Sequence, residues 1–302
     1  MGIKALNKLC KNCNKIKIND DSKIVIISDV HRGDGTYADS LIGNKNIYFA
    51  ALSYYYNEGY TLIEAGDGDE LWKNKNYIDI AYNYDGIFKL LNKFNKEERL
   101  HLIYGNHDKE KSNPEYMDKQ LKKMECMGKN FANEFKELVN SIVFQEAVIL
   151  NYQKNNKDIL ITHGHQVDFV NYELCCISRF LVRYIWRFLE GIAGCKAPTS
   201  PANSYKKGGK IDRKLEDYAR RKRKMIICGH THKSRFPEVG KGTYFNDGSC
   251  VMPYSMSSIE ICHGMIMLVK WSMYVKEDRS LYINRKIIAG PNKLEHYLKY
   301  TL

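Results

Sequence analysis

Five short polar clusters in this chain hold six of its nine histidines, and three of the clusters carry aspartate and four carry glycine. The clusters span residues 28–31, 66–70, 105–108, 162–165 and 229–232. Imidazole nitrogens together with carboxylate oxygens suit manganese, iron or zinc, whereas a site for magnesium alone would use mostly oxygen ligands. The clusters therefore predict a site for divalent metal ions.

The spacing within two clusters predicts paired ligands. Asp29 and His31 are separated by one residue, as are His230 and His232. On an extended segment, side chains two positions apart point to the same face. The single carboxylate of Asp67 can bridge two ions, and the glycines beside many of these residues allow the backbone to turn sharply. The pattern favours a dinuclear centre.

Each cluster follows a short run rich in β-branched or other apolar residues, at residues 23–28, 60–65, 100–104, 159–162 and 225–228. Continuous apolar runs are typical of strands that are buried on both faces. Segments compatible with helices, at residues 47–57 and 85–94, alternate with the early runs and predict βαβ units and a largely parallel sheet. Ligands gather beyond the carboxyl ends of such strands, so the five clusters can converge there.

The rest of the chain predicts a late antiparallel region and two segments that stand apart. Strands are expected at residues 243–246, 258–262, 265–274 and 281–287, and a helical segment at 113–137. Residues 1–20 are interpreted as an N-terminal extension, and residues 21–302 as the main domain. Residues 171–224, with a Gly/Pro/Ser-rich middle between helix-like ends, are interpreted as a helical cap inserted in that domain.

The ordered series D-x-H, G-D-x-x-E, G-N-H-D, H-G-H and G-H-T-H resembles the calcineurin-like metallophosphoesterases, over roughly residues 23–250. The resemblance implies an α/β fold, a metallophosphoesterase-type β-sandwich flanked by helices. It implies two divalent ions, which we expect to be Mn²⁺, with iron or zinc as alternatives. The implied ligands are Asp29, His31, Asp67 and His232 for one ion, and Asp67, Asn106, His163 and His230 for the other.

The resemblance also implies a mechanism for hydrolysing phosphoesters. A water that bridges the two ions loses a proton, and the resulting hydroxide attacks phosphorus in line. His107, held by Asp108, is expected beside the leaving group, where an imidazole can donate a proton. Arg32 and Asn106 are expected to contact the substrate phosphate. The predicted activity is that of a phosphatase or phosphodiesterase.

Several residues of the clusters have two interpretations. Asp69 and Glu70 suit a solvated turn as well as a contact with substrate. His165 suits a position next to the ligands as well as one without a role. Trp72 and the tyrosines at residues 54–56 are expected to pack in the core or on a helix face.

A second sub-family offers an alternative substrate. The segment GDGDELW, residues 66–72, resembles the GD-x-x-E-x-W signature of UDP-diacylglucosamine pyrophosphohydrolases, which also carry a helical cap between the H-G and G-H-x-H motifs. That branch typically has arginine after the asparagine of the third motif, where this chain has His107. Phosphoester hydrolysis is therefore the prediction, and cleavage of a nucleotide-diphospho-sugar or lipid precursor is the alternative.

The charge distribution predicts an anionic partner. The chain has a net charge of +12, and residues 171–224 hold fourteen Lys/Arg against five Asp/Glu. A phosphorylated small molecule or a lipid-linked substrate fits this charge. Arg179, Arg183 and Arg187 form one stripe of an apolar helix at residues 174–189. The pattern favours a cap helix that packs on the core with a solvated basic edge, and peripheral contact with an anionic membrane is the alternative.

Other classes of protein fit the sequence less well. No apolar run approaches the roughly eighteen residues of a membrane span, and the first residues lack a signal core, so we expect a cytoplasmic protein. Membrane association through residues 174–189 is the alternative. A nuclease is not expected, because no nucleic-acid module is recognisable. A non-catalytic scaffold would have lost ligands, and every expected ligand is present. The isolated pair Cys10 and Cys13 is a weak zinc signal.

Overall fold

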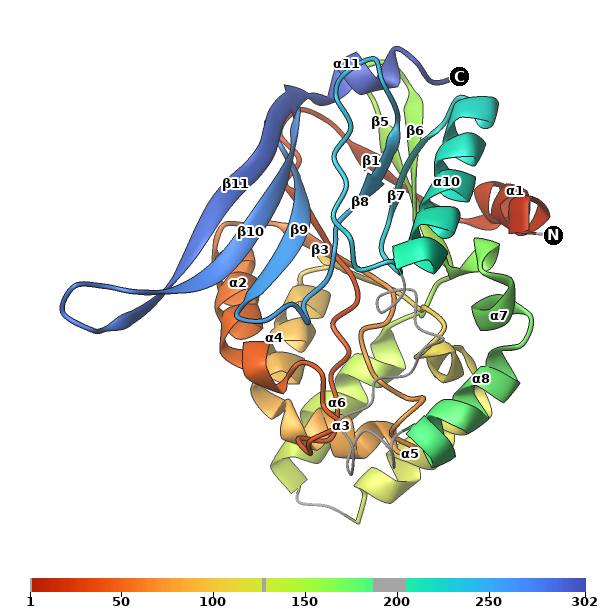
Figure 1. Cartoon of the computed structure of the whole chain (residues 1–302). Coiled ribbons are helices and arrows are strands. Elements are labelled where there is room, and N and C mark those ends of the chain that lie inside the picture. Colours follow the sequence, from red (N-terminus) through yellow and green to blue (C-terminus); the bar gives the residue numbers. More distant parts are fainter. Residues whose placement is uncertain (1, 127–128, 187–204) are drawn as a thin grey trace.

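Two mixed β-sheets pack face to face in the computed structural model, which describes residues 2–126, 129–186 and 205–302 (Figure 1). The first sheet has the strand order β1–β5–β6–β7–β8 and the second the order β11–β10–β9–β2–β3–β4. A cluster of buried apolar side chains from both sheets, among them Ile26, Ile63, Ile161 and Ile227, fills the space between them. The predicted α/β fold with a β-sandwich is confirmed.

The strands of the first sheet are β1 (Asn14–Ile18), β5 (Ala147–Tyr152), β6 (Lys157–Thr162), β7 (Met225–Cys228) and β8 (Tyr244–Asn246). Those of the second are β2 (Ile24–Ile27), β3 (Thr61–Ala65), β4 (Leu100–Ile103), β9 (Ser255–Cys262), β10 (Met265–Val275) and β11 (Leu281–Lys293). All nine predicted strands are present. Strands β1 and β5 were not predicted.

The apolar runs are continuous because both faces of these strands are buried. In β2, Ile24 and Ile26 face the other sheet, while Val25 and Ile27 face the helices. Strands β2, β3 and β4 are parallel, as the βαβ pattern predicts. The sheet is nevertheless not largely parallel, because β9, β10 and β11 continue it in antiparallel fashion. The antiparallel region expected late in the chain is confirmed for β9, β10 and β11, which join this sheet. It is wrong for residues 243–246, because β8 pairs in parallel with β7 in the other sheet.

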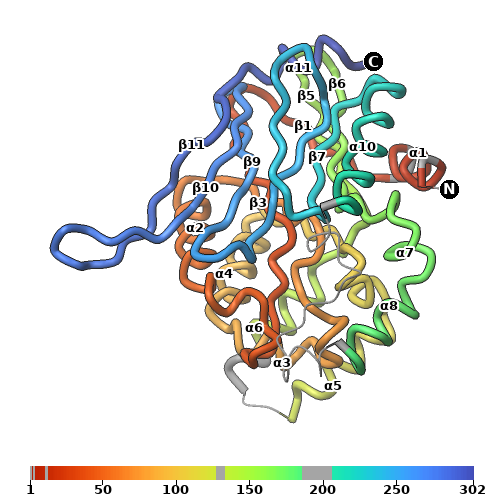
Figure 2. Tube along the Cα trace, viewed as in Figure 1, coloured from red at the N-terminus to blue at the C-terminus, as the bar shows by residue number. Residues whose placement is uncertain are grey.

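Helices cover the outer faces of the sandwich (Figure 2). The six-stranded sheet is covered by α2 (Lys45–Asn57), α3 (Tyr77–Asn83), α4 (Asp85–Lys96), α5 (Pro114–Met124) and α6 (Lys129–Ser141), whose apolar residues share one core with its strands. Helices α1 (Gly2–Asn12) and α10 (Tyr205–Lys222) cover the five-stranded sheet. The predicted helices at residues 47–57 and 85–94 are α2 and α4, and the helical segment at 113–137 forms α5 and most of α6.

The segment expected to be an N-terminal extension contains α1 and β1. Strand β1 pairs in parallel with β5, and Leu6 of α1 is buried against the five-stranded sheet. The segment expected to be a cap contains the second half of α7 (Phe169–Tyr172), then α8 (Cys175–Leu181), η4 (Val182–Trp186) and α10, while residues 187–204 of it lie outside the described residues. The assignment of 171–224 as a cap insertion stays a prediction.

The short elements that complete the chain are η1 (Ile42–Asn44), η2 (Lys109–Ser112), η3 (His165–Val167) and α11 (Leu294–Leu298). Within the described ranges, every helix is too short or too polar to cross a membrane.

Candidate metal centre

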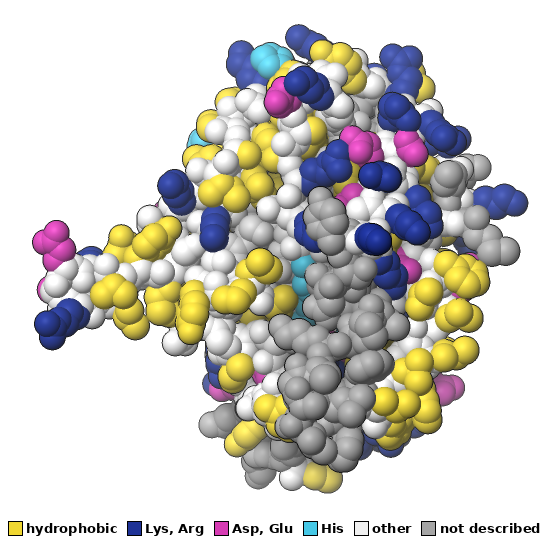
Figure 3. All heavy atoms as spheres, viewed as in Figure 1, with side chains coloured by type: hydrophobic (Ala, Val, Ile, Leu, Met, Phe, Trp, Pro, Cys, Tyr) yellow, Lys and Arg dark blue, Asp and Glu magenta, His cyan; other side chains and the backbone are white. Residues whose placement is uncertain are grey.

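The five polar clusters meet at the carboxyl ends of β2, β3, β4, β6 and β7, as predicted from their positions after the strands. Backbone hydrogen bonds join them: the amides of Asp29 and His31 donate to the carbonyls of Gly66 and Asp67, at 3.0 and 2.9 Å. The amide of Gly229 donates to the carbonyl of His163 at 3.1 Å. Histidine side chains reach the surface near the middle of the face drawn in Figure 3.

Asp29, His31 and His232 form the first group of ligand atoms that could hold one ion. The Asp29 Oδ1 atom lies 3.0 Å from His232 Nε2 and 3.8 Å from His31 Nε2. The two imidazole Nε2 atoms are 3.3 Å apart. These three residues come from two clusters that are about two hundred positions apart in sequence, so the fold brings them together.

Asp67, His163 and His230 form a second group, which is buried throughout. The Asp67 Oδ2 atom lies 3.1 Å from His163 Nε2 and 3.9 Å from His31 Nε2, a residue of the first group. One carboxylate oxygen therefore lies between the two groups. This is the position that a carboxylate bridging two ions would take.

Asn106 adds a neutral oxygen to the site. Its side chain is buried, and neither polar atom of its amide has a hydrogen-bond partner among the described residues. A buried amide without partners is unfavourable by about 1–3 kcal/mol. The adjacent backbone N–H of His107 donates to Asp67 Oδ1 at 2.8 Å, which places the Asn106 segment directly beside Asp67. A metal ion bound to the amide oxygen would satisfy that atom.

The remaining ring nitrogens of three histidines have partners that orient them. His163 Nδ1 lies 3.1 Å from the Ala65 carbonyl, which can only accept, so Nδ1 carries the proton. His31 Nδ1 lies 3.0 Å from Glu70, and His230 Nε2 lies 3.2 Å from Asp168. Metal-ligating histidines almost always donate their other ring N–H to a carbonyl or carboxylate. Each ring is thus held with one nitrogen left for an ion.

Charges within the site shift the pKa values of these groups. Burial alone would raise the pKa of Asp67, but His163 and His107 hold it far below its usual range. Burial would lower the pKa of His163, and Asp67 and Asp29 outweigh it and raise that pKa to about 9. A cation bound between His163 and Asp67, whose Nε2 and Oδ2 atoms are 3.1 Å apart, would take the place of the proton that this raised pKa favours. Burial lowers the pKa of His230 and keeps it neutral, as a ligand must be.

The backbone is strained where the ligand candidates lie. Five of them adopt positive φ: 50° at Asp29, 51° at His31, 52° at Asp67, 70° at His230 and 55° at His232. Side chains with a Cβ adopt this region at a cost of about 1–3 kcal/mol each, and such residues concentrate at functional sites. The paired ligands therefore converge through left-handed turns and not, as their spacing predicted, on extended segments.

Glycine is required beside the ligands because of crowding. Gly66 adopts a φ of 98°, and a Cβ on it would come within 2.6 Å of the His163 ring. A Cβ on Gly105 would overlap the carboxylate of Asp67. Glycine at these positions allows three backbone segments to approach one carboxylate.

His107 is oriented by Glu70 and Trp72, not by Asp108. Its Nδ1 lies 2.8 Å from Glu70 Oε1, and its ring stacks on Trp72 with a centroid distance of 4.2 Å. The prediction that Asp108 holds His107 is wrong, because the Asp108 carboxylate instead accepts from the amides of Gly105 and Gly68, at 2.7 and 3.0 Å. Asp108 fixes the backbone on which His107 is carried.

Arg32 lies in a buried ionic cluster beneath the site. Its guanidinium is fully buried and binds Glu64 at 2.7 Å with both Nη atoms and Asp69 at 2.7 Å with Nε. Lys111 adds ion pairs to Asp69 and Asp108, at 2.8 and 2.7 Å. This geometry corrects the prediction that Arg32 contacts the substrate: its donors are directed into the protein interior. The cluster instead joins the loops that follow β2, β3 and β4.

Three residues orient histidines of the site in ways that the sequence does not reveal. Glu70 and Trp72 orient His107, and Asp168 orients His230. The sequence leaves Glu70 open between a solvated turn and a contact with substrate, and it predicts that Trp72 packs in the core or on a helix face; Asp168 lies outside the five clusters. His165 is buried near the rings of His163 and His230, at centroid distances of 5.4 and 6.3 Å, so it adjoins the candidate ligands.

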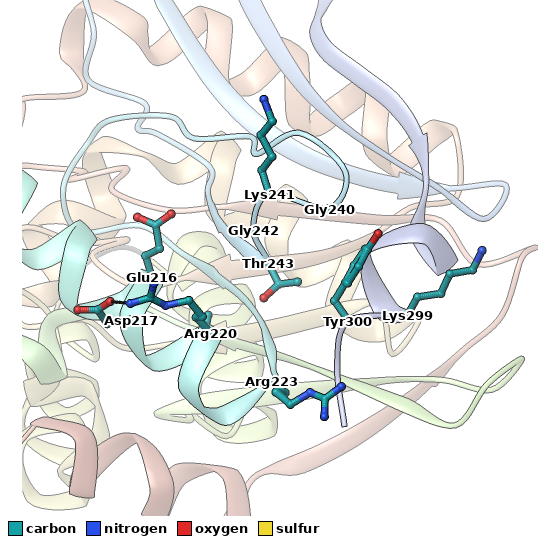
Figure 4. Close-up of a pocket in the computed structure, with 11 residues that line it drawn as sticks. Glu216, Asp217, Arg220, Arg223, Gly240, Lys241, Gly242, Thr243, Lys299 and Tyr300 are labelled. Carbon is teal, nitrogen blue, oxygen red and sulfur yellow. Dashed lines mark hydrogen bonds and ion pairs between the residues drawn. The ribbon is translucent and has the colours of Figure 1, made fainter.

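A cavity of ≈ 610 Å³ lies apart from this centre, between the end of α10, the segment before β8 and the C-terminus (Figure 4). None of the residues that line it belongs to the five clusters. Some of the charged side chains there are paired, as Asp217 and Arg220 are at 2.6 Å. The cavity therefore does not mark the metal centre.

The side chains at the centre fit a pair of divalent metal ions. The donor set combines imidazole nitrogens, carboxylates and an amide oxygen that lacks a partner among the described residues. A third group, His31, Glu70 and His107, also has the spacing of a metal site. There Glu70 accepts hydrogen bonds from both imidazoles, so this group is complete without an ion.

The chain was compared with family models, with curated proteins and with solved structures. A family model described as "Calcineurin-like phosphoesterase" matches residues 22–234. No curated protein matches the sequence. Among solved structures, Vps29 of Chaetomium thermophilum is similar at 8% identity and a TM-score of 0.37, with 89% of this chain and 96% of that chain covered.

Proposed function

This chain belongs to the calcineurin-like phosphoesterase family, and on that premise we propose that it hydrolyses phosphoesters with two divalent metal ions. The observation that supports this most is the position of Asp67, whose carboxylate lies between the two groups of ligand atoms. The proposed ligands are Asp29, His31, Asp67 and His232 for one ion, and Asp67, Asn106, His163 and His230 for the other. Mn²⁺ is the expected ion, with iron or zinc as alternatives.

Two bound ions would lower the pKa of a water molecule held between them and draw charge from the phosphoryl oxygens. The protein holds the ligands rigidly, through strained turns and the ionic cluster of Arg32 and Lys111. This rigidity limits how far the ligand side chains must rearrange when the metal ions and the substrate bind. The ligands lie at the carboxyl ends of the strands, where His232 and His107 are partly exposed to solvent. A phosphate group can therefore approach the centre from the solvent side.

His107 is the proposed proton donor to the leaving group. Its ring is 19% exposed and lies edge-on to His31, at a centroid distance of 4.8 Å, so it borders both the centre and solvent. Glu70 accepts from Nδ1, and Trp72 fixes the plane of the ring. Nε2 is then the nitrogen that delivers a proton to the departing oxygen.

The substrate class is proposed to be a phosphomonoester or phosphodiester. An alternative is the diphosphate of a nucleotide-linked sugar or lipid precursor, which the segment at residues 66–72 favours. In the structure this segment carries both Glu70 and Trp72 beside His107. The same hydrolytic centre serves either substrate, so the choice depends on groups outside it.

The experiment compares hydrolysis of p-nitrophenyl phosphate, bis-p-nitrophenyl phosphate and a UDP-sugar by metal-stripped protein to which Mn²⁺, Fe²⁺ or Zn²⁺ is returned. We expect turnover only with metal, and we expect Asp67→Ala and His230→Ala to abolish it. Asp118→Ala, an exposed carboxylate on α5, is the matched control and should not change it. Turnover that survives Asp67→Ala and His230→Ala with metal supplied would overturn the proposal.

A further inference from the structure

Helix α8 and its continuation η4 have their apolar side chains on the outside. Ile177, Phe180 and Tyr184 are 59, 58 and 61% exposed, whereas Ser178 and Val182 are buried. A helix on the surface of a soluble domain ordinarily places its apolar face toward the core. The orientation here is reversed.

The inner face of this segment is held by its arginines. Arg183 donates to the backbone carbonyls of Leu71 and Trp72, at 2.5 and 3.0 Å, and Arg179 pairs with Glu110. Of the basic stripe predicted at Arg179, Arg183 and Arg187, the first two therefore face the protein and not solvent, and Arg187 lies outside the described residues. Since Trp72 stacks on His107, the segment is anchored at the edge of the metal centre.

The outward apolar side chains form a continuous ridge. Phe180 and Tyr184 are in ring contact, with centroids 5.0 Å apart, and Phe169 on α7 is 57% exposed. Figure 3 shows apolar side chains gathered where Figure 1 places α7 and α8. Exposed apolar groups that adjoin one another mark an interaction site, whereas scattered ones do not. The ridge consists of Phe169, Leu174, Ile177, Phe180, Tyr184 and Ile185.

Basic side chains of α10 border the ridge. Lys214 donates to the Val167 carbonyl at 3.1 Å, and Lys207 lies 3.3 Å from Asp168, so this helix adjoins the start of α7. Lys210 and Arg213 are exposed on the same helix. Figure 3 shows Lys and Arg side chains grouped above the ridge, over α10.

We propose that the ridge and the basic border of α10 dock on an anionic lipid bilayer. Apolar side chains would enter the boundary between headgroups and acyl chains, while the lysines and arginines contact lipid phosphates. If the proposed function holds, the metal centre beside Trp72 then acts on phosphoesters presented at the membrane surface. A second copy of the chain is a poorer occupant, because each copy carries a net charge of +12 and two copies repel, whereas an anionic bilayer attracts the basic border.

The test is co-sedimentation with vesicles of phosphatidylcholine, with and without an equimolar amount of phosphatidylglycerol. We expect binding to the anionic vesicles alone, and loss of binding at high salt. Ile177→Asp with Phe180→Asp should weaken binding about tenfold or more. Lys210→Gln with Arg213→Gln should weaken it about 25-fold, since each basic residue near the surface contributes about fivefold. Val143→Asp, at an apolar residue that is 70% exposed outside this face, is the matched control.

Hydrolysis of the water-soluble bis-p-nitrophenyl phosphate separates this proposal from the proposed function, because the ridge variants should leave it unchanged. Wild-type protein that hydrolyses this ester but does not sediment with anionic vesicles would overturn the docking proposal alone. Equal binding by wild type and the ridge variants would also overturn it. The proposal would also be overturned if light scattering showed that the wild type is a dimer and the Ile177→Asp, Phe180→Asp variant is not, since a second copy of the chain would then occupy the ridge.

Discussion

Replacing Glu70 with glutamine tests whether this carboxylate orients the centre. Glu70 is buried and accepts from His31 Nδ1 at 3.0 Å and from His107 Nδ1 at 2.8 Å. Burial would raise its pKa, but His107 lowers it well below its usual range, so the carboxylate is ionised. A hydrogen bond to a charged group contributes about 1.5–3 kcal/mol, against about 0.5–1.5 kcal/mol for a neutral one.

His31 and His107 bind different oxygens of Glu70, and glutamine keeps only one acceptor oxygen. One bond is therefore weakened by about 1 kcal/mol and the other, of about 1.5–3 kcal/mol, is lost; a total of about 3 kcal/mol corresponds to roughly a 150-fold effect. We expect Glu70→Gln to lower kcat with Mn²⁺ by about 100-fold or more, at or above the upper end of the range of 10–100-fold typical for partners of metal ligands. The assay is hydrolysis of bis-p-nitrophenyl phosphate together with Mn²⁺ affinity, and Glu58→Gln, an exposed glutamate, is the control. Unchanged kcat and affinity in folded Glu70→Gln protein would refute the reasoning.

Three further changes have defined outcomes. His107→Asn should slow the hydrolysis of alkyl phosphoesters by about 100-fold or more. It should slow the hydrolysis of p-nitrophenyl esters much less, since p-nitrophenolate leaves without a proton. Equal slowing of both series would contradict the role of His107 as proton donor. Arg32→Met should lower the free energy of unfolding in urea by about 3–5 kcal/mol by leaving buried carboxylates unpaired, whereas exposed Arg221→Met should have almost no effect. Burial alone would raise the pKa of Asp69, but Arg32 and Lys111 outweigh it and lower that pKa to about 2. The ionised Asp69 therefore stabilises the folded protein above the ordinary pKa of an aspartate, and this stabilisation is lost as the pH falls toward 2. The stability difference between wild type and Asp69→Asn, measured by urea unfolding, should be constant above about pH 4 and shrink below it; a difference that grows on acidification would contradict this sign.

The buried strands were predictable because burial on both faces leaves a continuous apolar run. Met225–Cys228 is such a run, and β7 has those bounds. Strand β1 was missed because its sequence, NKIKI, alternates lysine with isoleucine at the exposed edge of a sheet. The pairing of β2 with β9, more than two hundred residues later, follows from tertiary packing that no local pattern encodes.

The candidate ligands were predictable because imidazole, carboxylate and amide groups at strand ends have few other uses. The groups around them were not. Glu70 lies in a run of glycine and acidic residues, for which a solvated turn is one of two interpretations. It is nevertheless buried, because both His31 and His107 donate to it. Arg32 follows two ligands and suggests a phosphate contact, yet Glu64 and Asp69, both on the next strand and its loop, bind it in the interior. Which buried charge meets which partner depends on the fold.

Anomalous diffraction at the manganese edge, from crystals grown with Mn²⁺, tests the central claim most directly. Two peaks about 3.5–4 Å apart are expected, one touching Asp29, His31 and His232, and the other His163 and His230, with Asp67 between them. A single peak, or a peak held by His31, Glu70 and His107, would contradict a dinuclear centre bridged by Asp67.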